Sequence, residues 1–142
     1  MKKQLVIVLS LLLVLVLGGC AVNARHGVLD ANGAEQLKLR QIQSRYFDTS
    51  DKQKTVEAVI ATLQDLGFVI DKASLPLGSV TGTKLKGYTI RMTVNVTPRG
   101  KDQMTVRANA QYNVTPIQDP APYQSFFNAL SKSMFLQAHL EE

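Results

Sequence analysis

The stretch that decides the fold is Tyr88-Thr89-Ile90-Arg91-Met92-Thr93-Val94-Asn95-Val96. Apolar and polar residues alternate along it, and successive side chains of a β-strand point to opposite faces of a sheet. The apolar residues therefore share one face, which we expect to be buried. The polar residues share the other, which we expect to face water.

The same alternation returns after a polar loop at residues 98–102. Its apolar positions are Met104, Val106, Ala108, Ala110 and Tyr112, and its polar positions are Thr105, Arg107, Asn109 and Gln111. The two segments predict an antiparallel hairpin with one dry face and one wet face.

Two helices are predicted from apolar residues that recur every three or four positions. The first covers residues 51–66, with N-cap candidates at residues 48–51 and Gly67 at the C′ position. The second begins at Asp119-Pro120 or Ala121-Pro122 and runs to about residue 139. Its wide apolar stripe contains Tyr123, Phe126, Phe127, Leu130, Met134, Phe135 and Ala138.

Shorter strands are predicted at residues 41–47, 68–73 and 80–85, with a turn at residues 75–78. The order is therefore β-α-β-β-β-β-α. Because each helix and the sheet carry one apolar face, the sequence predicts an α+β fold of two layers. Both helices would cover one face of an antiparallel sheet.

The chain begins with a basic Met1-Lys2-Lys3-Gln4 and an apolar run at residues 5–17, which has the length of a signal sequence. Leu17-Gly18-Gly19-Cys20 follows and resembles the lipobox of bacterial lipoproteins. The resemblance implies cleavage between Gly19 and Cys20, with a diacylglyceryl group and an N-acyl chain on Cys20. An ordinary signal peptide with an incidental cysteine and an uncleaved anchor are the alternatives.

The lipobox resemblance also implies a location and a division of the chain. Ala21, rather than aspartate, follows the cysteine, which favours the periplasmic face of the outer membrane over the inner membrane. We expect a signal peptide at residues 1–19, a flexible tether at residues 20–36 and one α+β domain at residues 37–142.

The charge and the cysteine count exclude several classes of function. The net charge is +5; without Lys2 and Lys3, 14 basic residues remain against 11 acidic ones, a net charge of +3. This excess is too small and too scattered to predict nucleic-acid binding. A single cysteine permits no internal disulfide and no cysteine-based metal site, and His26 and His139 lie far apart in the sequence.

Residues suited to catalysis do not gather in the sequence. It has no Gly-rich phosphate loop, nucleophile elbow or metal-binding helix pair. We interpret Asp65 and Asp71 as solvated carboxylates rather than an acid/base pair, and His139 as a residue that favours the helix dipole. We therefore expect no enzyme, no metal and no cofactor other than the lipid on Cys20.

The wet face of the hairpin is the candidate binding surface. Arg91, Arg107, Thr93 and Asn109 would form a weakly cationic surface without an acidic member, for peptidoglycan, lipid headgroups or a protein partner. A merely solvated face is the alternative. Lys84 and Lys86 would extend this surface or protect an edge strand.

The sequence also resembles known lipoproteins. Residues 45–49, 63–68 and 123–127 (RYFDT, LQDLGF and YQSFF) resemble a family of small uncharacterised proteobacterial lipoproteins. The element order resembles the helix-grip domains of the C-component lipoprotein of the β-barrel assembly machine, in topology alone and with one domain instead of two. Neither resemblance implies a catalytic residue.

Together these features predict a non-enzymatic, periplasm-facing lipoprotein with an accessory or scaffolding role in a cell-envelope complex. One alternative is a carrier of lipid or another apolar ligand, held in a cavity behind Phe126, Phe127, Leu130 and Met134. The other is a peptidoglycan or glycan binder that uses Arg91 and Arg107.

Overall fold

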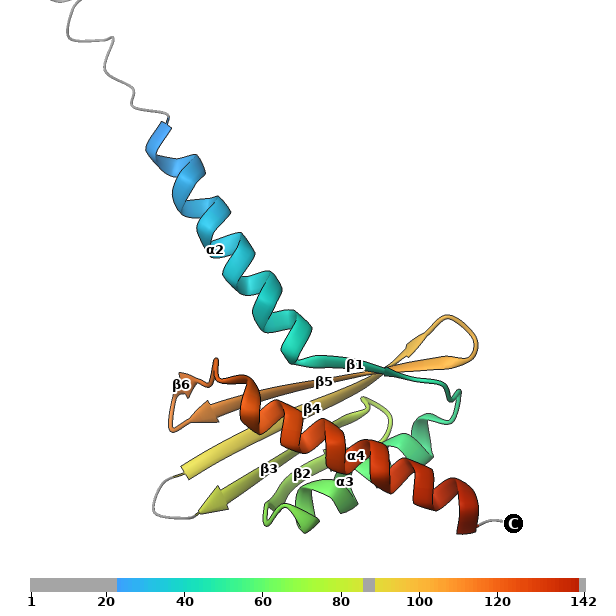
Figure 1. Ribbon diagram of the computed structural model, residues 1–142. Helices are drawn as coiled ribbons and strands as arrows, with labels where there is room; N and C mark the ends of the chain where they lie inside the picture. Colours follow the sequence, from blue (N-terminus) through green and yellow to red (C-terminus); the bar gives the residue numbers. More distant parts are fainter. Residues whose placement is uncertain (1–22, 86–88, 141–142) are drawn as a thin grey trace, which may run out of the picture. The chain divides into compact units, whose positions relative to one another are not determined.

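The computed structural model describes residues 23–85 and 89–140, with side chains at residues 33–85 and 89–135 (Figure 1). The predicted signal peptide, Cys20 and Ala21 lie outside the described residues, as do Lys86 and Tyr88. By its internal contacts the chain divides into two units, Met1–Gln36 and Leu37–Glu142. The sheet and the two helices that pack on it belong to the second unit.

The described strands form one antiparallel sheet in the order β1-β5-β4-β3-β2, with the short β6 also paired to β5. The strands are β1 (Ser44–Phe47), β2 (Val69–Ser74), β3 (Ser79–Leu85), β4 (Thr89–Arg99), β5 (Gln103–Tyr112) and β6 (Thr115–Pro116). The predicted hairpin is the β4–β5 pair, in which Val94 lies opposite Ala108 and Val96 opposite Val106. The predicted alternation of faces is confirmed, because Met92, Val94 and Val96 are buried.

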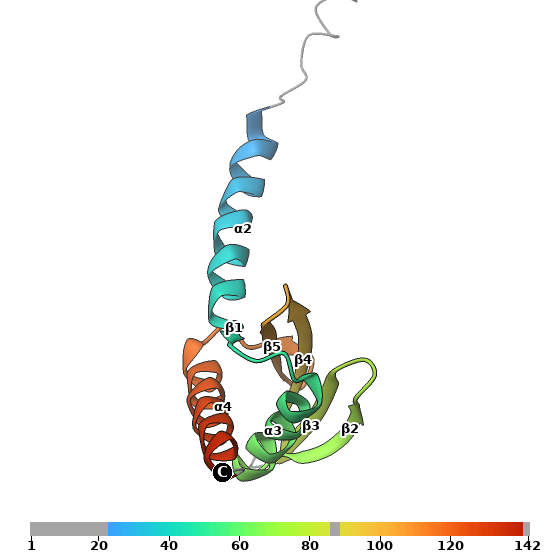
Figure 2. The same ribbon diagram turned by 90° about the vertical axis from the view of Figure 1, so that its right-hand side faces the viewer.

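Helices α3 (Lys52–Asp65) and α4 (Pro120–Leu140) cover one face of the sheet (Figures 1 and 2). Asp51 caps α3 by accepting a hydrogen bond from the Lys54 amide at 2.9 Å, and Gly67 follows the helix with a φ of 83°. At α4 the Asp119 carboxylate accepts from the Ala121 amide at 2.9 Å, so the helix uses the first of the two predicted starts. The predicted α+β fold of two layers is confirmed.

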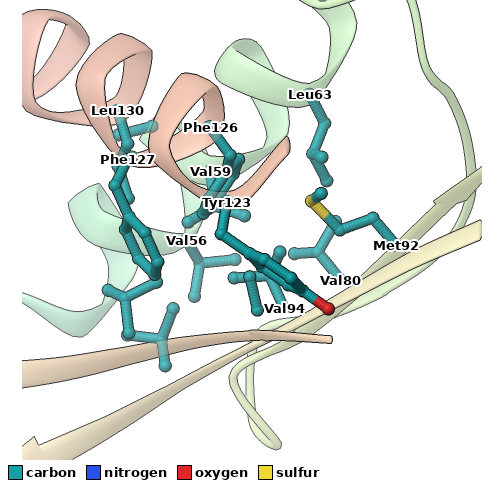
Figure 3. Packing of buried hydrophobic residues seen from close by; sticks show 14 of the residues in the cluster. Val56, Val59, Leu63, Val80, Met92, Val94, Tyr123, Phe126, Phe127 and Leu130 are labelled. Carbon is teal, nitrogen blue, oxygen red and sulfur yellow. The ribbon is translucent and has the colours of Figure 1, made fainter. Parts of the chain in front are cut away.

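The hydrophobic core fills the space between the sheet and these helices (Figure 3). From α4, Phe126 and Leu130 are fully buried, and Phe127 packs edge-on against Phe126 with ring centroids 5.1 Å apart. The other buried apolar residues are Val56, Ala58, Val59, Leu63, Phe68, Val80, Met92, Val94, Val96, Met104, Val106, Ala108, Ala110 and Tyr123.

The hydroxyl of Tyr123 forms a hydrogen bond with β5 where this strand has no neighbouring strand on the side away from β4. Strand β1 pairs with the beginning of β5 and β6 with its end, which leaves the Ala110 amide between them without a strand partner. The Tyr123 hydroxyl accepts from this amide at 3.2 Å and donates to the carbonyl of Ile117 at 2.7 Å. The side-chain amide of the buried Gln43 also donates to the hydroxyl, at 3.2 Å. Tyr123 therefore joins α4 to three segments of the chain at one buried point.

The structure forms a helix in the segment predicted as a flexible tether, residues 20–36. Helix α2 (Asn23–Ile42) occupies this segment from Asn23 onward, and the first strand, predicted from residue 41, begins at Ser44. Residues 33–38 are all exposed, so this part of the helix buries no face and shows no apolar period. Ala34, Glu35, Gln36, Leu37 and Lys38 nevertheless all have high helix propensity. Within the described residues, no helix is both long and apolar enough to cross a membrane.

Candidate functional site

The face of the sheet opposite the helices carries the four predicted binding residues. Arg91, Thr93, Arg107 and Asn109 alternate with buried residues along β4 and β5, so all four point away from the core. Thr93 lies directly opposite Asn109, whereas Arg107 lies opposite Asn95. We call this surface the outer face. It also includes the residues of β1, β2 and β3 that point to the same side of the sheet.

The two arginines of the outer face lie on different strands and at different positions along the sheet. Arg91 lies opposite Gln111, and Asn95, four residues further along β4, lies opposite Arg107. At about 3.4 Å per residue, the two arginine positions are separated by about 14 Å along the strands. Arg107 donates from Nε to the Ser44 hydroxyl at 3.2 Å. An extended partner can therefore contact both arginine positions along the strands.

The outer face also contains a carboxylate, on β2 and therefore outside the hairpin face that the sequence predicted. The pairing of β2 with β3 shifts between Ile70 and Lys72, and Asp71 lies at this bulge. Its carboxylate accepts a hydrogen bond from the Thr83 hydroxyl at 2.6 Å. Lys72, the next residue, lies opposite Thr81. Because a bulge breaks the strict alternation, the sequence pattern alone did not place Asp71 here.

A cation–π stack lies at one end of the outer face, and the sequence did not predict it. The guanidinium carbon of Arg99 lies 3.6 Å from the centroid of the Tyr46 ring, and Tyr46 is 58% exposed. Tyr46 lies opposite Thr105, which places it on the outer face. No local signal joins residues 46 and 99, because β5 brings β1 beside this hairpin only in the folded sheet.

Lys84 lies on the inner face of the sheet and on β3, which lies between β2 and β4, so neither predicted alternative, an extension of the outer face or the protection of an edge strand, holds for it. Along β3 the inward positions are Val80 and Gly82, and Lys84 follows them in the same alternation. Its Nζ donates to the carbonyl of Leu66, at the C-terminal end of α3, at 2.6 Å. The ammonium also lies 5.7 Å from the centroid of the Phe68 ring. This cation therefore faces the helix layer and offsets the negative end of the α3 dipole.

A pocket of about 270 Å³ lies around Lys84. Its described lining consists of Leu66, Phe68, Lys84, Ile90, Met92, Pro122 and Ser125. We call this the Lys84 pocket. It does not coincide with the cavity predicted for an apolar ligand, since Phe126, Phe127 and Leu130 are buried in the core and do not line it. Figure 3 shows Met92, the deepest member of the lining, with its sulfur directed at Leu63.

The remaining predicted residues form no further site in the described part of the chain. Asp65 is exposed at the end of α3, and Asp71 bonds to Thr83. The side chains of His26 and His139 lie outside the described ones. Among the residues described, no three histidine, cysteine or acidic side chains gather as a metal site would require.

Comparison of the chain with protein-family models and with curated proteins finds no match. The resemblances drawn from residues 45–49, 63–68 and 123–127, and from the helix-grip topology, therefore stay predictions.

Proposed function

We propose that the protein is a lipid-anchored, non-enzymatic accessory component of a cell-envelope complex. The observation that carries the proposal is the order of a basic start, an apolar run and Leu17-Gly18-Gly19-Cys20. Lipid on Cys20 holds the chain at the periplasmic face of the outer membrane. Since each buried methylene contributes about 0.8 kcal/mol, two or more acyl chains anchor the protein stably.

Metabolic labelling tests the anchor. Cells that produce the full chain are grown with labelled palmitate, and the label is expected on the N-terminal peptide of the wild-type protein. Cys20→Ser should abolish the label, whereas Ala21→Ser should keep it. Separation of the membranes should place the labelled protein in the outer membrane. Equal labelling of the Cys20→Ser chain would contradict the proposal.

The outer face supports the accessory role. Helices α3 and α4 lie on the opposite face of the sheet, and Arg91 and Arg107 are exposed. A membrane tether raises the effective concentration of such a surface for partners in the same envelope. Threonine and asparagine side chains around two separated cations offer many hydrogen bonds, which suits a polar protein surface.

Site-specific cross-linking in intact cells tests this role. A photoreactive amino acid replaces Asn109 on the outer face or, as the control, the exposed Glu57 on α3. We expect a discrete cross-linked product at position 109 and none at position 57, with the partner identified by mass spectrometry. The same products at both positions would contradict a specific interface on the outer face.

The separation of the two arginines favours a second candidate, a binder of peptidoglycan or another glycan. Two arginine positions about 14 Å apart along the strands suit an extended chain with repeated polar groups. The test compares cell-wall material recovered with the wild-type chain and with the Arg91→Ala/Arg107→Ala variant. Recovery should fall markedly in the variant; unchanged recovery would exclude this candidate.

A further inference from the structure

We propose that the Lys84 pocket binds a short acyl chain that ends in a carboxylate. This site lies on the opposite side of the sheet from the outer face, so it adds a ligand-binding activity to the proposed accessory role.

The size and the lining of the pocket indicate the apolar part of the ligand. Five of the seven described lining residues are apolar: Leu66, Phe68, Ile90, Met92 and Pro122. Small-molecule sites typically have volumes of about 300–1,000 Å³ and apolar walls with a few polar groups. At about 270 Å³ the pocket is near the lower limit of this range. It therefore accommodates one short chain rather than a whole membrane lipid.

The two polar lining residues indicate the head group. None of the seven described lining residues is acidic, and Lys84 brings a cation to the apolar wall. Its ammonium has three N–H donors, of which the Leu66 carbonyl accepts one at 2.6 Å. The hydroxyl of Ser125, on α4, is the other polar group of the lining. A carboxylate suits this pair, because charge-assisted hydrogen bonds are stronger than neutral ones.

The Lys84 side chain is held in place before a ligand binds. Its Nζ is fixed by the Leu66 carbonyl and lies beside the Phe68 ring. A Cβ atom on Gly67 would lie 3.6 Å from Lys84 Cε, so the lysine stem packs closely over this glycine. Such preorganisation reduces the side-chain entropy lost when the ligand binds.

Photolabelling of the full chain in isolated membranes tests the proposal. The probes are decanoic acid and decanol that carry the same photoreactive group and alkyne tag. Labelled peptides are mapped by mass spectrometry, which separates the pocket from the N-terminal peptide. We expect the acid to label peptides that contain Phe68 or Met92, in preference to the alcohol.

Two matched serine variants test the location of the site. Ser125 and Ser131 are both exposed on α4, but Ser125 lines the pocket and Ser131 bonds to the Phe127 carbonyl. Ser125→Trp should lower labelling by the acid about tenfold, the effect of a lost contact of about 1.4 kcal/mol. Ser131→Trp should leave labelling unchanged. Equal labelling in both variants would overturn the proposal.

The role of Lys84 is tested by the preference for acid over alcohol, which a merely structural lysine would not affect. Lys84→Gln should make the two probes label equally, and Lys84→Arg should retain the preference for the acid. An unchanged preference in Lys84→Gln would refute recognition of the carboxylate. Circular dichroism of each variant checks its fold. Palmitate labelling of Cys20 is measured separately, so a failure of the anchor proposal can be distinguished from a failure of the pocket proposal.

Discussion

Along β4 and β5, neighbouring residues lie in opposite environments. Val94 and Val106 are fully buried beneath the helices, whereas Thr93 is only partly buried and Arg107 is exposed. The inner face thus removes apolar surface from water, which is the main favourable contribution to folding. The outer face keeps its hydrogen-bonding groups accessible. The comparison teaches that one side of these strands contributes to stability, whereas the other presents polar groups to the solvent.

The largest effect is expected where the inner face meets α4. Phe126→Ala removes a fully buried ring and should lower the free energy of unfolding by about 3–5 kcal/mol. Thr105→Ala, on the outer face of β5, should change it by less than about 0.5 kcal/mol. Urea unfolding followed by circular dichroism measures both values. Similar losses in the two variants would remove the proposed difference between the faces.

A smaller loss is expected when one hydroxyl is removed from the inner side. Tyr123→Phe leaves the Ala110 amide and the Ile117 carbonyl without this partner. It should destabilise the protein by about 2 kcal/mol, since a buried unpaired group costs about 1–3 kcal/mol. Hydrogen exchange at the Ala110 amide should also accelerate. The control, Tyr46→Phe, alters an exposed ring on the outer face, and exchange at Ala110 should not change in it.

The inner side also contains a polar group whose removal should stabilise the protein. Among the described side chains, the Thr62 hydroxyl is buried without a hydrogen-bond partner. Thr62→Val should therefore raise the free energy of unfolding by about 1 kcal/mol. Thr93→Val, in contrast, removes a bond of 3.2 Å to Thr81 on the outer face and should not stabilise. Thermal unfolding of both variants shows whether each substitution stabilises or destabilises the protein. A lower midpoint for Thr62→Val would contradict the prediction.

The smallest effect is expected from the arginines of the outer face. Arg91→Ala/Arg107→Ala should shift the free energy of unfolding by no more than about 0.5 kcal/mol, because both side chains are exposed. The measurement is urea unfolding of the double variant beside the wild type. A loss above about 1 kcal/mol would mean that this face contributes to stability in addition to its proposed role in recognition.

The sequence predicted most of the sheet and both packed helices because these elements bury one face. Residues such as Val94 and Phe126 repeat at the period of a strand or a helix, and burial imposes that period. Helix α2 was not predicted because residues 33–38 are exposed and so lack the apolar period. At Asp71 the bulge broke the alternation on which the prediction depended.

The candidate sites were predicted in part. Arg91, Thr93, Arg107 and Asn109 were correctly assigned to one face, since alternation along two strands is enough to group them. The stack of Tyr46 on Arg99 was not predicted, because it joins residues from β1 and β4 that meet only in the sheet. The Lys84 pocket has the same origin: its described lining comes from α4, from strands β3 and β4, and from the turn between α3 and β2.

By itself, the sequence determined the two-layer α+β fold and the division of the hairpin into a dry face and a wet face. It is also the sole source of the lipobox prediction at Cys20. These features depend on local order along the chain, in the spacing of apolar residues and in a contiguous motif. Tertiary structure alone decided that Lys84 faces inward beside Leu66, that the Tyr123 hydroxyl bonds to β5, and that the two arginines stand apart. The reason is physical: each arrangement joins segments distant in the sequence, whose distances and registers are set only when the sheet and helices pack together.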